Sequence, residues 1–213
     1  MEIISLSVGM MPTNCYIAAS DEKNAAVIDP GGDPEKILHV LESRGWTARK
    51  VFLTHGHFDH VGAVKALQAA GVAAGVSRED EIFLTAPELT YAGMDLPITE
   101  DLRIRPDFTF EGGQGLELDE LAFRVIATPG HTRGSVCFLC GDVIFSGDTL
   151  FREGCGRTDL YGGSWNDMND SLKKLAGLPG DFRILPGHGA ETTLGYERRY
   201  NQWMGAADYD FDD

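Results

Sequence analysis

Cationic side chains are scarce in this sequence. Its 213 residues include 18 Lys and Arg against 33 Asp and Glu, a formal net charge of −15 at pH 7. A nucleic-acid partner needs Lys and Arg to displace the counterions of its phosphates, and an anionic membrane surface attracts the same side chains. We therefore expect neither nucleic acid nor a membrane as a partner. Part of the acidic excess lies in a C-terminal tail that we place at residues 208–213.

Cysteines and long apolar runs are also few. Four cysteines in a chain of this length do not make a disulfide scaffold. No stretch of about 18 apolar residues is present to span a membrane. The first six residues lack the basic start and the apolar run of a signal peptide. A reducing cytoplasm is the expected compartment, and the oligomeric state is not indicated.

The chain is long enough for one domain with a sizeable core, which we place at residues 1–207. Its 26 Gly predict many tight turns. Apolar periodicity predicts short strands mixed with helices, while residues 77–109 show no regular pattern apart from a helical stretch at 88–92. The expected strands are 3–8, 14–19, 25–29, 50–54, 72–76, 121–127, 136–139, 143–145 and 183–185, and the expected helices are 33–43, 61–70, 166–175 and 192–204.

The densest group of metal-binding side chains lies in the stretch Thr54–His60, which holds three histidines and one aspartate. A strand precedes it and a helix follows, so the stretch forms the turn at the carboxyl end of a strand, where α/β sheets place their ligands. His55 and His57 can point the same way, whereas Asp59 and His60 leave in another direction. Two groups from one loop suggest two adjacent metal ions. A metal-free loop is disfavoured, because such groups packed together would repel one another.

Three further side chains recur in the same context. His131, Asp148 and His188 each follow a short apolar run and lie beside glycine, which lets the backbone turn sharply near an ion. Five imidazoles and two carboxylates are too many for one closed structural zinc site with four ligands. They suit two ions of zinc, iron or manganese about 3.5–4 Å apart, with open positions for water and substrate.

Other polar residues have weaker signals. Asp29 ends a strand, and it either caps the turn or accepts a hydrogen bond that orients the histidine loop. Thr132, with Ser135, has the same two interpretations. His39 stands alone on an apolar helix, so we expect a structural or surface role. Cys137 and Cys140 face opposite sides of a strand, which argues against a shared metal or a redox pair.

The motifs together resemble the metallo-β-lactamase superfamily. They are His55-x-His57-x-Asp59-His60, Pro129-Gly130-His131-Thr132, Ser146-Gly147-Asp148 and Pro186-Gly187-His188-Gly189, in this order. The resemblance implies an α/β fold, a four-layer αβ/βα sandwich with the metals at one edge of two mixed sheets. It also implies the ligand sets: His55, His57 and His131 for the first ion, Asp59, His60 and His188 for the second, and Asp148 as the bridge.

Within the superfamily, Leu150-Phe151 and the run Gly154–Asp159 resemble the glyoxalase II (hydroxyacylglutathione hydrolase) branch, in its short bacterial form. An aspartate at 148 departs from the class B β-lactamases that have a cysteine ligand there. The chain also stops soon after His188, so the C-terminal helical domain that carries glutathione-binding basic residues in the long enzymes is mostly missing.

The resemblance implies attack by a metal-bridging hydroxide on a thioester, S-lactoylglutathione or a related hydroxyacyl thioester. Asp59 would orient the hydroxide and Asp148 would fix the ion spacing. Arg157 is the candidate for a substrate carboxylate contact, or else pairs with Asp159, and Tyr161 is a candidate for the pocket lining. The alternatives are a mononuclear iron persulfide dioxygenase, a lactonase-type hydrolase of the same fold, and a non-catalytic metal-binding module.

Overall fold

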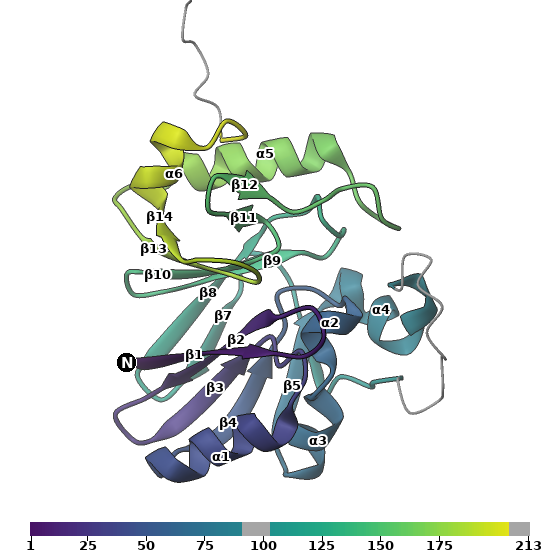
Figure 1. Cartoon of the computed structure of the whole chain (residues 1–213), viewed down its shortest axis with the longest axis vertical. Helices are drawn as coiled ribbons and strands as arrows, with labels where there is room; N and C mark the ends of the chain where they lie inside the picture. The colour runs from purple at the N-terminus through teal and green to yellow at the C-terminus, as the bar shows by residue number, and fades with distance from the viewer. Residues whose placement is uncertain (91–102, 205–213) are drawn as a thin grey trace, which may run out of the picture.

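The computed structural model describes residues 1–90 and 103–204. Two six-stranded sheets pack face to face, with helices on both outer faces (Figure 1). In this described part of the chain, no helix is long and apolar enough to cross a membrane. The domain limit predicted at residue 207 and the acidic tail both lie outside the described residues.

The first sheet begins as an antiparallel meander and continues with parallel strands. Its order is β1 (Glu2–Val8), β2 (Thr13–Ala19), β3 (Asn24–Ile28), β4 (Thr47–Phe52), β5 (Ala73–Ser77) and β6 (Phe108–Phe110). The parallel strands need crossover connections, which include α1 (Pro34–Arg44), α2 (Phe58–Val61) and α3 (Val64–Ala69). After β5 come two 3₁₀ turns, Arg78–Asp80 and Pro87–Leu89, on either side of α4 (Glu81–Thr85).

The second sheet is also mixed, because β10 and β13 are parallel and the other neighbours are antiparallel. Its order is β14 (Thr192–Thr193), β13 (Arg183–Pro186), β10 (Val143–Gly147), β9 (Val136–Cys140), β8 (Leu121–Ala127) and β7 (Gly115–Leu118). A small hairpin, β11 (Leu150–Phe151) and β12 (Gly154–Cys155), follows β10. The helices α5 (Trp165–Ala176) and α6 (Leu194–Tyr200) cover the outer face (Figure 1).

Three apolar layers hold these elements together. The middle layer lies between the sheets and is rich in aromatic rings, among them Phe52 and Phe138, whose centroids are 5.6 Å apart. The other two layers lie under α1 and α3, and under α5 and α6. The predicted αβ/βα sandwich is thus confirmed. Cys137 and Cys140 fall in different layers, as their opposite strand faces require.

The sequence predicts one helix at 61–70, but the structure has two shorter helices in this region, α2 and α3. A Cβ on Gly62 would lie 2.4 Å from the Gly31 carbonyl oxygen, so the chain packs here against the turn after β3. The Ala63 N–H donates to the Pro30 carbonyl at 2.8 Å instead of continuing a helical ladder. Packing against a neighbouring turn therefore overrides the helical pattern.

Smaller differences occur elsewhere. Asp33 precedes α1, but its carboxylate accepts from the Gly9 N–H at 3.1 Å and makes no capping hydrogen bond. The helix predicted at 192–204 is preceded by β14 and ends at Tyr200. The strands β6 and β7 were not expected, and of the helical stretch predicted at 88–92 only residues 88–90 are described, where a 3₁₀ turn ends at Leu89. His39 is exposed on α1.

Candidate metal centre

The seven predicted ligands converge at one edge of the sandwich, where β4, β8, β10 and β13 end. Backbone contacts between the two sheets bring these loops together. The Val136 N–H donates to the Thr54 carbonyl at 2.8 Å, and the Asn14 N–H donates to the Gly187 carbonyl at 2.7 Å. The Tyr16 hydroxyl donates to the Pro186 carbonyl at 2.7 Å. The first sheet therefore fixes where the second sheet presents its side chains.

One group consists of His55, His57 and His131, whose nearest ligand atoms lie within 4.8 Å of one another. His57 Nδ1 and His131 Nε2 are 2.8 Å apart. The other ring nitrogen of His131, Nδ1, donates to the Arg157 carbonyl at 2.7 Å. Because a neutral imidazole has one N–H, this bond leaves a lone pair on Nε2 that faces His57.

A second group consists of Asp59, His60 and His188, again with ligand atoms within 4.8 Å. Asp148 lies between the two groups. Its Oδ1 is 3.4 Å from His60 Nε2, and its Oδ2 is 3.6 Å from His131 Nε2 and 3.7 Å from His188 Nε2. One carboxylate thus faces both groups, as a side chain that bridges two cations would.

The nitrogen and oxygen atoms of the cluster are placed to bind a cation rather than to form hydrogen bonds with one another. His55 Nε2, His57 Nε2, His60 Nε2 and Asp148 Oδ1 are buried and have no hydrogen-bond partner among the described residues. A buried polar atom without a partner costs about 1–3 kcal/mol, so several in one place need a common ligand. Imidazole nitrogens with carboxylate oxygens suit zinc, iron or manganese.

Asp29 orients this group through Thr54. Its Oδ1 accepts from the Thr54 N–H at 2.8 Å, and its Oδ2 accepts from the Thr54 hydroxyl at 2.7 Å. Since that hydroxyl donates to Asp29, it accepts from His55 Nδ1 at 3.1 Å, which leaves the lone pair of His55 on Nε2. His60 Nδ1 lies 3.1 Å from Asp29 Oδ2. These are the contacts that the orienting interpretation of Asp29 requires. Thr54 has no sequence signal that sets it apart from an ordinary turn residue.

Asp80 is a second orienting carboxylate, and no pattern in the sequence indicates its role. It is fully buried, and its oxygens accept from the Gly56 N–H at 2.9 Å and the Gly134 N–H at 2.8 Å. The Thr132 hydroxyl donates to it at 2.7 Å. Asp80 therefore connects the loop of His55 and His57 to the loop of His131 by hydrogen bonds. The Thr132 hydroxyl contacts Asp80 and Ser135, and among the described residues neither the Thr132 nor the Ser135 hydroxyl forms a hydrogen bond with a histidine.

The charges of the cluster are set by burial and by neighbours. Burial lowers the pKa of His55 well below its usual value and lowers the pKa of His57 to about 3, so both rings are neutral at pH 7. Burial opposes the charged form of His60, but the Asp148 and Asp29 carboxylates outweigh it and raise the pKa of His60. Burial raises the pKa of Asp80 to about 6, despite its three hydrogen bonds.

A cavity of about 250 Å³ opens onto the cluster. Met11, Phe58, Leu160 and Arg157 line it together with most of the clustered side chains. Of the two roles that the sequence leaves open for Arg157, the structure shows the pair with Asp159, at 2.7 Å and 2.8 Å. Tyr161 does not line this cavity and faces an adjoining one with Phe83.

Comparisons with known proteins agree with this architecture. The family model described as the metallo-beta-lactamase superfamily matches residues 8–188. The chain is 38% identical over 211 residues to hydroxyacylglutathione hydrolase GloC of Haemophilus influenzae, covering 96% of this chain and 98% of the relative.

Two solved structures are similar over nearly their whole length. The BLEG-1 B3 metallo-beta-lactamase matches with a TM-score of 0.89 and 33% identity, covering 96% of this chain and 100% of the other. TTHA1623, in a di-iron-bound form, matches with a TM-score of 0.82 and 36% identity, covering 93% and 98%.

Proposed function

The chain belongs to the metallo-beta-lactamase superfamily and is a hydrolase of that fold, and from that premise we propose that it cleaves a thioester. The proposed substrate is S-lactoylglutathione or a related hydroxyacyl thioester. The observation that carries this proposal is the position of Asp148 between two groups of metal-binding side chains. The similarity to a relative named hydroxyacylglutathione hydrolase supports the choice of substrate.

The residues would hold two divalent ions, most simply zinc. His55, His57 and His131 would hold the first, Asp59, His60 and His188 the second, and Asp148 would contact both. When bound, such ions lower the pKa of water toward about 7 and polarise a carbonyl oxygen.

The protein's own groups position the reaction. Asp29 and Thr54 keep the lone pair of His55 directed into the cluster, and the Arg157 carbonyl does the same for His131. Asp59 Oδ2 lies 3.2 Å from His188 Nε2, and the carboxylate can also accept a hydrogen bond from the attacking water and so aim it. The cavity beside the cluster would admit the acyl group against Met11, Phe58 and Leu160. Arg157 stays a proposed substrate contact, although Asp159 already binds its guanidinium.

We also propose the cytoplasm as the compartment and a small-molecule thioester, rather than nucleic acid or a membrane, as the partner. All four cysteines are free thiols in the structure, which fits a reducing compartment. The charge of −15 disfavours nucleic acid as a partner.

A persulfide dioxygenase is the second candidate, because two histidines and a carboxylate around one iron could be drawn from the same cluster. The similarity to a protein that binds two irons supports iron as a possible metal, although in a binuclear site. A lactonase-type hydrolase would use the same residues as a thioester hydrolase, so only turnover of a lactone against a thioester distinguishes the two.

The test is elemental analysis of the purified protein, followed by turnover of S-lactoylglutathione, a lactone and a β-lactam, and oxygen uptake with glutathione persulfide. Two metal ions per chain and thioester hydrolysis are expected. The Asp148→Asn variant should lose turnover and bind fewer than two ions. One iron per chain with oxygen uptake and no thioester turnover would instead support the dioxygenase.

A further inference from the structure

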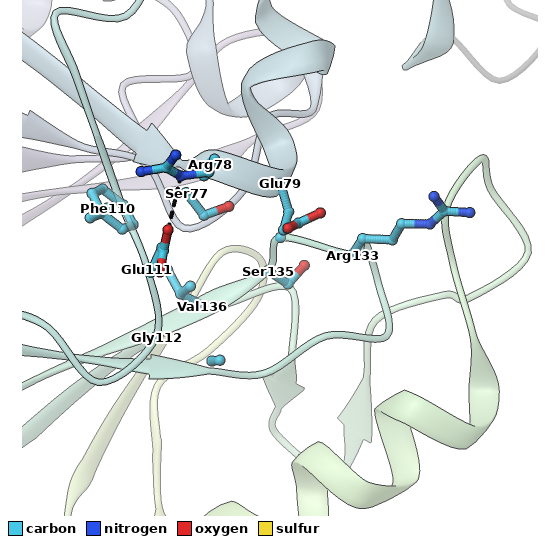
Figure 2. A pocket seen from close by; sticks show the side chains of 11 residues that line it. Ser77, Arg78, Glu79, Phe110, Glu111, Gly112, Arg133, Ser135 and Val136 are labelled. Atoms are coloured by element: carbon cyan, nitrogen blue, oxygen red, sulfur yellow. Dashed lines mark ion pairs between the residues drawn. The ribbon is translucent and has the colours of Figure 1, made fainter.

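A charged groove lies beside the metal-centre cavity and has no role in the chemistry described above. It consists of two cavities, of about 320 and 340 Å³, which share the lining residues Arg78, Glu79 and Arg133. The larger one also contains Phe83 and Tyr161. Figure 2 shows the other, where Arg78 pairs with Glu111 at 2.9 Å and Arg133 points away from that pair.

Two charges of this groove are unpaired. The side chains of Arg133 and Glu79 form no hydrogen bond and no ion pair with any residue in ranges 1–90 and 103–204, and both are exposed. The stem of Arg133 packs near Gly162, where a Cβ would lie 3.7 Å from Arg133 Cγ and 3.7 Å from Phe83 Cζ. The hydroxyl of Ser77, which lines the cavity in Figure 2, is buried without a partner among the described residues. An unpaired guanidinium and an unpaired carboxylate in the same groove are complementary to a ligand that carries both a negative and a positive charge.

The groove is within reach of the metal centre. The ring of Phe83 is 5.5 Å from the ring of His57 and 6.1 Å from the ring of Tyr161, measured between centroids. Leu160 lines the metal-centre cavity, and the next residue, Tyr161, lines the groove. An extended tripeptide spans about 10 Å, so a thioester at the cluster can place the far end of a peptide carrier here.

We propose that this groove binds the α-amino-acid end of a peptide thiol, with Arg133 holding its carboxylate and Glu79 its ammonium group. The proposal rests on the proposed function and specifies the carrier of the thioester. The proposal assigns the carrier's α-carboxylate to Arg133 and not to Arg157, because the Arg157 guanidinium already makes two hydrogen bonds to Asp159. Arg133 lines the groove, and its guanidinium donors have no partner among the described residues, so they are free for a carboxylate.

The first test compares two thioesters that share the lactoyl group. S-lactoylglutathione carries the amino-acid end, and S-lactoyl-N-acetylcysteamine does not. Arg133→Gln should raise the KM for S-lactoylglutathione about tenfold with kcat within about twofold, because one charge-assisted contact is lost. Glu79→Gln should raise that KM about threefold, and neither variant should change kinetics with the cysteamine thioester.

The matched control is Arg124→Gln. Arg124 is exposed on β8 and lines neither the metal-centre cavity nor the groove, so this variant removes the same charge elsewhere. If Arg124→Gln raises the KM as much as Arg133→Gln, the effect is general attraction of an anionic substrate and the groove proposal is wrong. An equal effect of Arg133→Gln on both thioesters would also overturn it.

A second measurement separates this proposal from the proposed function. S-methylglutathione has no thioester, so calorimetric titration reports binding without turnover. Weaker binding to Arg133→Gln than to Arg124→Gln supports the groove even if no thioester is cleaved. Equal binding to both variants overturns the groove even if S-lactoylglutathione is hydrolysed.

Discussion

At the scale of single residues, the metal centre is held by side chains that do not line its cavity, among them Asp29, Thr54 and Asp80. Asp29 contacts His55 through the Thr54 hydroxyl and His60 directly, and among the described residues Asp80 contacts the histidine loops through backbone N–H groups and Thr132. The histidines and aspartates of the loop are visible in the sequence because they are close together along the chain. Asp80 and Thr54 are not, because their roles depend on contacts across 24 to 54 residues of sequence.

Replacing Asp80 with Ala should damage both the fold and the metal centre. Three buried donors would lose their acceptor, at a cost of about 2–4 kcal/mol in the free energy of unfolding, and metal affinity should fall about 10- to 100-fold. Urea unfolding of the metal-free protein and a competitive chelator titration measure the two effects. The control is Glu79→Ala, an exposed neighbour that should change neither. Unchanged metal affinity in Asp80→Ala would contradict the orienting role.

Two variants of Thr54 test the orienting role of its hydroxyl directly. Thr54→Val keeps the side-chain shape but removes the hydroxyl between Asp29 and His55, so the lone pair of His55 is no longer fixed on Nε2. We expect metal affinity to drop about tenfold in Thr54→Val and to be nearly unchanged in Thr54→Ser. Equal affinities for the two variants would show that the hydroxyl does not orient the ring.

At the scale of elements, the loop between β4 and α3 is shaped by close backbone packing. Sequence periodicity places Val61, Val64, Ala66, Leu67 and Ala70 on one apolar face of residues 61–70. Val61, Val64 and Leu67 are buried, whereas Ala66 is half-buried and Ala70 is exposed. The periodicity does not predict the break between α2 and α3, because it contains no information about the turn after β3 that packs against Gly62. The strands β6 and β7 escape detection because they have only three and four residues.

The Gly62→Ala variant tests this packing. Its Cβ would lie 2.4 Å from the Gly31 carbonyl oxygen, a backbone atom that cannot move aside without shifting the turn. We expect a loss of about 1–3 kcal/mol in stability by urea unfolding, together with weaker metal binding, because Asp59 and His60 belong to the displaced helix. Gly115→Ala on β7 is the control, since a Cβ there meets nothing within 4 Å. Equal stability of the two variants would argue against the close approach.

At the scale of the whole molecule, the proposed ions would connect the two sheets, because the first sheet supplies four of the seven ligands and the second sheet supplies three. The resemblance to a known family predicted this convergence and the layer order. The hydrogen bonds that bring the loops together, such as that from the Tyr16 hydroxyl to the Pro186 carbonyl, could not be predicted. They join residues as far as 170 positions apart in the sequence.

Metal binding should therefore stabilise the whole fold, and it should do so less at low pH. The raised pKa of His60 means that the metal-free protein holds a proton there, which a cation must displace. The melting temperature should rise on adding zinc and fall with a chelator. The zinc-dependent rise should shrink as the pH is lowered, and calorimetry in buffers of different ionisation enthalpy should detect proton release near pH 7. A pH-independent rise without proton release would contradict this account.

The hydrogen bonds from Asn14 to the carbonyls of Pro186 and Gly189 carry a consequence for biosynthesis. They join the second strand to the last ligand loop, 172 and 175 positions later in the chain. A nascent polypeptide therefore cannot complete this cation site until residues 186–189 have left the ribosome. The ligands of residues 55–60 are made much earlier, so the full set of seven is complete only when the last ligand loop reaches Asn14.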